Sequence, residues 1–215
     1  MKSTILLLLT ALVLAGSAAQ AGVINLVTNG SFEQGVLGIA TFQGWQTTLP
    51  DANTFVDSDG KTGTLYGDAS DGLWSAFFGT PAAAGGASIS QSLATTPNQL
   101  YSLSFDLAND NGGLTPVNSF VVSLGGAPVL TFTNIVDQVY IGEQYSFVAS
   151  GNSTALEFSG SNDQSYFDLD NVAVTPAPEP SSFPLAGVGA ILLCAAARNR
   201  TKRLSGTRHR SRGKY

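Results

Sequence analysis

The stretch that decides the fold is LYSLSFDLA at residues 100–108, where apolar and polar side chains alternate strictly. In an extended chain the apolar and polar side chains would lie on opposite faces: Tyr101, Leu103, Phe105 and Leu107 against Ser102, Ser104 and Asp106. This period of two is typical of a β-strand that buries one face in a core. No stretch between residues 22 and 174 shows the sustained 3.6-residue period of a helix.

Weaker alternation recurs on both sides of this stretch, at residues 73–78, 88–93, 120–124, 129–132, 144–148, 156–158 and 166–174. Turn-forming residues separate these segments, at 59–60, 71–72, 85–86, 111–113, 125–126 and 151–152. Many short strands with such punctuation predict one all-β sandwich over residues 22–174. Its phenylalanine, tyrosine and tryptophan side chains can fill a core without disulfides, and the chain has one cysteine.

The net charge of −5 hides a segregation of charge along the chain. All 15 acidic residues lie between Glu33 and Glu179, where the single basic residue is Lys61. Basic residues gather instead in a tail at residues 198–215, which contains no acid. An acidic body lacks the clustered bases that phosphates require, so we expect no nucleic-acid partner.

The first 21 residues have the pattern of a secretory signal peptide. Lys2 is followed by an apolar run at residues 5–14, and Ala19-Gln20-Ala21 supplies the small residues that signal peptidase accepts. The sequence therefore predicts an exported protein that signal peptidase cuts before Gly22.

A second apolar run, FPLAGVGAILLCAAA, occupies residues 183–197 and precedes the basic tail. Its 15 residues fall just below the usual minimum of about 17 for a membrane-spanning helix, but flanking arginines can extend the span. The positive-inside rule then places tail 198–215 in the cytoplasm and the acidic body outside. The alternative is a buried helix of a soluble domain, which Gly187 and Gly189 disfavour.

Between the body and this run lies a proline-rich linker, TPAPEPSS, at residues 175–182. Pro178-Glu179-Pro180, an apolar helix and a basic end together resemble the PEP-CTERM sorting signal of Gram-negative bacteria. The resemblance implies that the membrane protease-transpeptidase exosortase cuts the chain near these prolines. The body would then pass to the cell surface or the exopolysaccharide matrix.

The body opens with NLVTNGSFE at residues 25–33 and closes with YFDLDNVAV at residues 166–174. These ends resemble galactose-binding-like jelly rolls, which include carbohydrate-binding modules. The resemblance implies a jelly-roll sandwich whose first and last strands pair, with a structural Ca²⁺ where they meet. Glu33, Asp170 and backbone carbonyls of residues 29–31 would be its ligands, and the alternative is that both acids are solvated strand ends.

Exposed aromatic side chains would give such a module its sugar platform. Trp45, between glycine and glutamine, is the candidate ring, while Trp74 lies in an apolar stretch that predicts burial. Asn109, Asp110 and Asn111, expected on a loop, are the polar candidates. The competing interpretation is that tryptophan in a sandwich belongs to the core.

The sequence does not favour an enzyme. Its one histidine lies in the tail, no G-x-S-x-G motif is present, and the four glutamates form no recognisable pair. The sequence therefore predicts a secreted, exosortase-sorted surface or matrix protein with a structural or carbohydrate-associating role. The alternatives are an uncleaved membrane-tethered sugar-binding module and a polysaccharide hydrolase.

Overall fold

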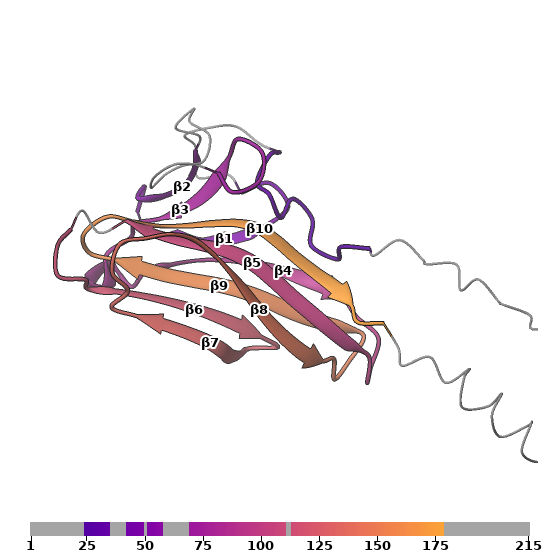
Figure 1. The fold of residues 1–215 in the computed structure, drawn as a ribbon. Coiled ribbons are helices and arrows are strands. Elements are labelled where there is room, and N and C mark those ends of the chain that lie inside the picture. The colour runs from indigo at the N-terminus through magenta and orange to yellow at the C-terminus, as the bar shows by residue number, and fades with distance from the viewer. Residues whose placement is uncertain (1–23, 35–41, 50, 58–68, 111–112, 179–215) are drawn as a thin grey trace, which may run out of the picture. The chain divides into compact units, whose positions relative to one another are not determined.

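The computed structural model describes residues 24–34, 42–49, 51–57, 69–110 and 113–178, which fold into a β-sandwich (Figure 1). Sheet I contains, in spatial order, β1 (Gln46–Thr48), β4 (Ala87–Ala94), β9 (Ser153–Asn162), β6 (Asn118–Leu124) and β7 (Ala127–Thr133). Sheet II contains β2 (Thr54–Asp57), β3 (Ser75–Phe78), β10 (Tyr166–Pro176), β5 (Leu100–Asp110) and β8 (Gln138–Val148). All paired strands are antiparallel, and one short 3₁₀ turn, η1 (Ala82–Ala84), is the only helical element in these ranges. The predicted all-β sandwich is confirmed.

Each strand predicted from alternation coincides with one of the strands β3 to β10. The sequence missed β1 and β2, which have three and four residues and lie within no longer alternating or apolar stretch. Strand β8 begins at Gln138, six residues before its predicted start at 144. A register shift opposite Leu107 and Asn109 interrupts its pairing with β5, so the pattern of faces breaks within the strand.

Aromatic rings from the inner faces of both sheets form the centre of the core. Phe120 of sheet I lies 5.3 Å from Phe78 and 5.2 Å from Phe167 of sheet II, measured between ring centroids. Phe158 of sheet I lies 5.3 Å from Phe105 of sheet II. All five rings are at most 1% exposed. Each contributes roughly 1.5–3 kcal/mol through burial alone, so this cluster holds the two sheets together.

The first described segment, residues 24–34, pairs with β10. The Leu26 N–H donates to the Val174 carbonyl at 2.8 Å, and the Val172 N–H donates to the Gly30 carbonyl at 2.9 Å. A Cβ at Gly30 would overlap the Val172 carbonyl, so this approach requires glycine. The pairing of first and last segments implied by the resemblance is therefore present, although residues 24–34 form no regular strand.

Several predicted features lie outside the described residues: the signal peptide 1–21, the apolar run 183–197, the tail 198–215, and Glu179 and Pro180 of the sorting motif. Pro178 is described and exposed. Strand β10 extends to Pro176, so regular structure continues into the predicted linker 175–182. Among the described residues, no helix has the length and apolar character needed to cross a membrane.

Candidate functional site

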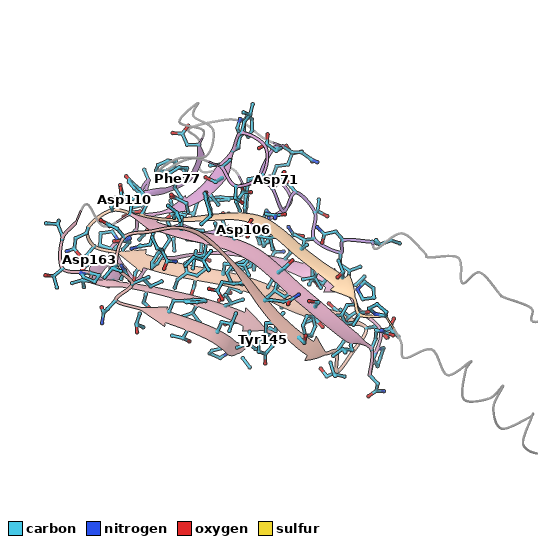
Figure 2. All side chains as sticks on the ribbon, viewed as in Figure 1. Asp71, Phe77, Asp106, Asp110, Tyr145 and Asp163 are labelled. Atoms are coloured by element: carbon cyan, nitrogen blue, oxygen red, sulfur yellow. The ribbon has the colours of Figure 1, made fainter. Side chains whose placement is uncertain are left out.

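The outer face of sheet II carries rings and carboxylates in addition to the small polar side chains usual on a solvated strand, such as Ser102 and Ser104. Strand pairing sets Phe55 opposite Phe77, Phe77 opposite Asp168, and Asp170 opposite Asp106. We call the following set the aromatic–acidic face: Phe55, Phe77, Tyr166, Asp106, Asp168 and Asp170. Figure 2 shows Phe77, Asp106 and Asp110 along this sheet, with Asp71 beside it.

The three rings of this face contact one another. Phe55 and Phe77 stack with centroids 5.3 Å apart and planes 8° apart. Tyr166 meets them edge-on at 5.6 and 5.9 Å. A Cβ at Gly79 would overlap the Tyr166 ring, so the glycine lets this ring lie close to the backbone. All three rings are half-buried, which leaves a fixed apolar patch that is partly open to solvent.

Asp170 is fully buried although it lies on the outer face of sheet II. Its Oδ2 accepts the backbone N–H groups of Ser70 and Asp71, both at 2.8 Å, and its Oδ1 accepts the N–H of Asn171 at 2.7 Å. Burial raises the pKa of this carboxyl to about 7, although the three N–H donors act in the opposite direction.

Glu33 holds the other end of the same segment. Its Oε1 accepts the backbone N–H groups of Leu73 and Trp74 at 2.6 and 2.7 Å. Gly72, with a φ of +74°, lies so close that a Cβ there would overlap the Glu33 carboxylate. The structure thus brings Glu33 and Asp170 to one segment, residues 70–74, which they fix through four backbone N–H donors.

These donors bear on the predicted calcium site. A hard cation needs free oxygen acceptors, but the Glu33 and Asp170 oxygens named above already accept N–H bonds. The Asn29 carbonyl accepts the Trp45 indole N–H at 3.2 Å, and the Gly30 carbonyl accepts the Val172 N–H. No group of three or more His, Cys, Asp or Glu residues in the described ranges could hold a metal ion. The residues fit Ca²⁺ poorly, and the calcium site stays a prediction.

Two hydroxyl groups complete the buried part of the face. Burial raises the pKa of Tyr140 on β8, and the Asp168 carboxylate adds to this rise. The Ser75 hydroxyl lowers the Tyr140 pKa and so offsets part of this rise. The Ser75 and Tyr140 hydroxyls nevertheless do not meet the geometric criteria of a hydrogen bond. Ser75 is fully buried, and its Oγ has no hydrogen-bond partner among the described residues. This polar group is therefore unsatisfied within a largely acidic setting.

Asp106 provides an accessible acceptor. Its Oδ2 accepts the Ser70 hydroxyl at 2.7 Å and the Asn171 side-chain amide at 3.1 Å. No hydrogen bond among the described residues uses its Oδ1. Gly142 lies opposite on β8, where a Cβ would stand 3.3 Å from this oxygen. The half-buried Asp106 carboxylate therefore borders a position that has no side chain.

The prediction that Trp45 is an exposed sugar platform is wrong. Its side chain is 7% exposed and stacks on Phe32 with ring centroids 5.8 Å apart. Gly44, with a φ of +86°, makes the turn that directs the indole into the core, where it also contacts Phe158. Trp74, predicted to be buried, is half-buried against the core.

The prediction that Asn109 and Asp110 lie on a loop is also wrong, since they are the last residues of β5. Asn109 is fully buried and donates to the Ile135 carbonyl at 3.0 Å, so it ties β5 to the segment before β8. Asp110 is half-buried and accepts the Ser165 hydroxyl at 3.1 Å. Asn111 lies outside the described residues. Neither Phe55 nor Phe77 could be told from an ordinary core residue by its neighbours in the sequence.

The outer face of sheet I is different in kind. Cross-strand pairing lines up serines there, with Ser88 opposite Ser159 and Ser119 opposite Ser161. Glu157 is the only charged residue in the five strands of this sheet. We call this surface the hydroxyl face. It contains a shallow hollow of about 170 Å³ lined by small residues, among them Ser119, Ser159 and Ser161.

Comparison with known proteins identifies the fold. No protein-family model matches the chain, and no curated protein matches it. TmCBM61 in complex with β-1,4-galactotriose has a TM-score of 0.53 at 12% identity, over 72% of this chain and 99% of that one. The xylan-binding CBM22-1 domain of Xyn10C from Paenibacillus barcinonensis has a TM-score of 0.44 at 20% identity, over 70% and 94%.

The enzymatically active domain of tailspike protein 4 from bacteriophage CBA120 has a TM-score of 0.50 at 15% identity. The match covers 72% of this chain and 22% of the tailspike chain, so the present chain spans about a fifth of that protein. At such identities the likeness establishes the architecture alone. The chain has a jelly-roll sandwich fold, and the carbohydrate-binding module TmCBM61 is among its structural neighbours.

Proposed function

We propose that the sandwich domain binds carbohydrate through the aromatic–acidic face. The observation that carries this proposal is the cluster of three half-buried rings, Phe55, Phe77 and Tyr166, on the same face as Asp106. Asp106 Oδ1 accepts no hydrogen bond from the described part of the chain. Sugar sites combine these two elements: an apolar ring face packs on aromatic side chains, while polar groups fix the hydroxyls. The shared fold with a module seen in complex with β-1,4-galactotriose supports the proposal.

The proposal is for binding without turnover. Within the described ranges there is no histidine, lysine or arginine, and the cysteine at 194 lies outside them. Carboxylates are the only strong acid–base groups left. A hydrolase would turn over a polysaccharide and lose this activity when one carboxylate is neutralised. Absence of turnover on any glycan that the domain binds would agree with the binding role.

A glycan array probed with the purified full-length chain tests the binding proposal. We expect defined hits that Phe77→Ala reduces at least tenfold, because the substitution removes one half of the stacked pair. Phe132→Ala is the matched control, since Phe132 is a half-buried phenylalanine on sheet I. An array without hits, or equal losses in both variants, would contradict the proposal.

We also propose that the chain works outside the inner membrane. The signal peptide pattern at 1–21 and the sequence of linker, apolar run and basic tail at 175–215 support export, temporary anchoring and cleavage by an exosortase. The body would then reside at the cell surface or in an exopolysaccharide matrix. Intact-mass measurement of the surface-associated protein tests this: loss of residues 198–215 is expected, and their retention would favour an uncleaved membrane tether.

A further inference from the structure

The described part of the chain carries negative charge without any compensating base. Of the 15 acidic residues, all but Asp59, Asp68 and Glu179 lie in the described ranges. These ranges contain no lysine, arginine or histidine. The charge is also unevenly placed, because the five strands of sheet I hold only one acid, Glu157. The five strands of sheet II hold six: Asp57, Asp106, Asp110, Glu143, Asp168 and Asp170.

This distribution bears on the kind of carbohydrate that the aromatic–acidic face accepts. Neutral sugars can donate hydroxyl hydrogen bonds to carboxylates, but they carry no charge that would balance the negative charge of this face. Acidic sugars would bring carboxylates towards carboxylates, and such like-charge contacts are unfavourable. A protonated amine, in contrast, forms charge-assisted hydrogen bonds with a carboxylate, which are about twice as strong as neutral ones.

The geometry offers places for such an amine. Asp106 Oδ1, beside Gly142, accepts no hydrogen bond from the residues that the structure describes. Asp71, whose N–H is bound to Asp170, is exposed on the neighbouring segment (Figure 2).

The spacing of rings and acceptor sets the size of the ligand. Phe77 pairs with Asp168 on β10, which pairs with Ala108 on β5, two residues from Asp106. Two strand spacings across the sheet and two residues along the strand separate the ring from the carboxylate, or roughly 12 Å. One sugar cannot stack on the rings and reach Asp106 at the same time, so the ligand must be an oligomer or polymer.

We propose that the aromatic–acidic face selects a polysaccharide that carries free amino groups. One sugar packs on Phe55, Phe77 and Tyr166, and the ammonium group of a nearby sugar binds Asp106 Oδ1. This inference rests on the proposed carbohydrate-binding function and adds the chemical class of the sugar. It predicts strong discrimination against the N-acetylated and acidic counterparts of the same chain length.

Isothermal titration of the full-length chain with three defined hexamers tests this selection: glucosamine, N-acetylglucosamine and galacturonic acid. At pH 6 and low salt we expect the glucosamine hexamer to bind at least tenfold more tightly than the N-acetylglucosamine hexamer. The galacturonic acid hexamer should not bind. Raising the salt concentration should weaken only the glucosamine complex, because screening acts on the charged pair.

Two substitutions that each remove one negative charge distinguish binding at a specific site from general attraction of a cationic glycan to an acidic protein. Asp106→Asn should weaken glucosamine hexamer binding about tenfold, because a neutral amide cannot form the charge-assisted bond with an ammonium group. Glu157→Gln makes the same change in net charge on the hydroxyl face and should have no effect. Circular dichroism spectra identical to wild type would show that both variants are folded.

The possible results distinguish this inference from the proposal on which it rests. Equal binding of the amino and N-acetylated hexamers would overturn the inference and keep carbohydrate binding. Equal losses of glucosamine hexamer affinity in Asp106→Asn and Glu157→Gln would also overturn it, since the hexamer would then be attracted by net charge and not by a specific site. Failure of all three hexamers, together with a glycan array without hits, would remove the carbohydrate-binding proposal itself.

Discussion

The two outer faces of this sandwich differ more than its two inner faces do. Both inner faces are built from phenylalanine and aliphatic side chains, as in the contacts of Phe120 with Phe78 and Phe167. The hydroxyl face of sheet I carries rows of serine with one acid, whereas sheet II carries three clustered rings and buried carboxylates. A fold needs its inner faces, but it does not need rings or buried acids on the outside.

Buried charge on an outer face is costly unless a specific set of hydrogen bonds offsets it. Three backbone N–H groups offset part of this cost at Asp170, although burial still outweighs them, and they fix residues 70–71 against the sheet. The comparison indicates that sheet II is specialised and that sheet I serves mainly to close the core. Each prediction below tests one side of this contrast.

The largest expected effect is the loss of stability on removing the Asp170 carboxylate. Asp170→Ala leaves the N–H groups of Ser70, Asp71 and Asn171 without acceptors and should lower the free energy of unfolding by about 3 kcal/mol. Ser159→Ala on the hydroxyl face should change it by less than about 0.5 kcal/mol. Urea unfolding measures both, and similar losses would remove the contrast between the faces.

Truncation of a ring should have a smaller effect on stability and a specific effect on binding. Phe77→Ala should cost about 1–2 kcal/mol, because the ring is only half-buried and its neighbours can partly close the gap. Val121→Ala, at a half-buried position on the hydroxyl face, should leave glycan binding unchanged. If both variants bound glycans as wild type does, sheet II would not be the binding surface.

The pH dependence of stability should show the buried acid directly. The pKa of Asp170 is raised to about 7 in the folded chain from an ordinary value of 3.8. Between these values the folded protein holds a proton that the unfolded chain has released, so stability should fall as pH rises through this window. Thermal melting from pH 5 to 8 should therefore lower the Tm of wild type by a few degrees more than that of Asp170→Asn. Parallel curves would contradict this.

The smallest expected effect concerns calcium. Because backbone N–H groups already occupy oxygens of Glu33 and Asp170, a chelator should leave the Tm unchanged. The Glu33→Gln variant provides the control, since it retains an acceptor oxygen for Leu73 and Trp74. A clear fall in Tm on chelation, lost in this variant and in Asp170→Asn, would restore the calcium site predicted from the sequence.

Sequence patterns predicted the sandwich because alternation and turn residues are local signals. The glycine pair at 125–126 illustrates this: both residues have positive φ, 61° and 83°, as a tight hairpin between β6 and β7 requires. Strands β1 and β2, of three and four residues, escaped detection because neither lies within a longer alternating or apolar stretch, as β3 does. Tertiary packing, and not local sequence, decided their conformation.

The candidate site was harder to predict because it depends on which side of a strand each residue faces. Trp45 was assigned to the surface from its polar neighbours, but the turn at Gly44 directs it inwards. Phe77 lies in the apolar run 73–78 and gave no sign of facing outwards. Asp170 was identified as important from its motif, but its partners, the N–H groups of residues 70–71, are 100 positions away in sequence.

The pairing of residues 24–34 with β10 has a mechanical consequence. Since Leu26 bonds to Val174 and Gly30 to Val172, the two segments run antiparallel and the described chain enters and leaves at the same end of the seam. Tension applied between residues 24 and 178 would therefore break the hydrogen bonds between these two segments one after another, and would not load all of them at the same time. A domain built this way resists heat through its core but yields to a pull on its ends.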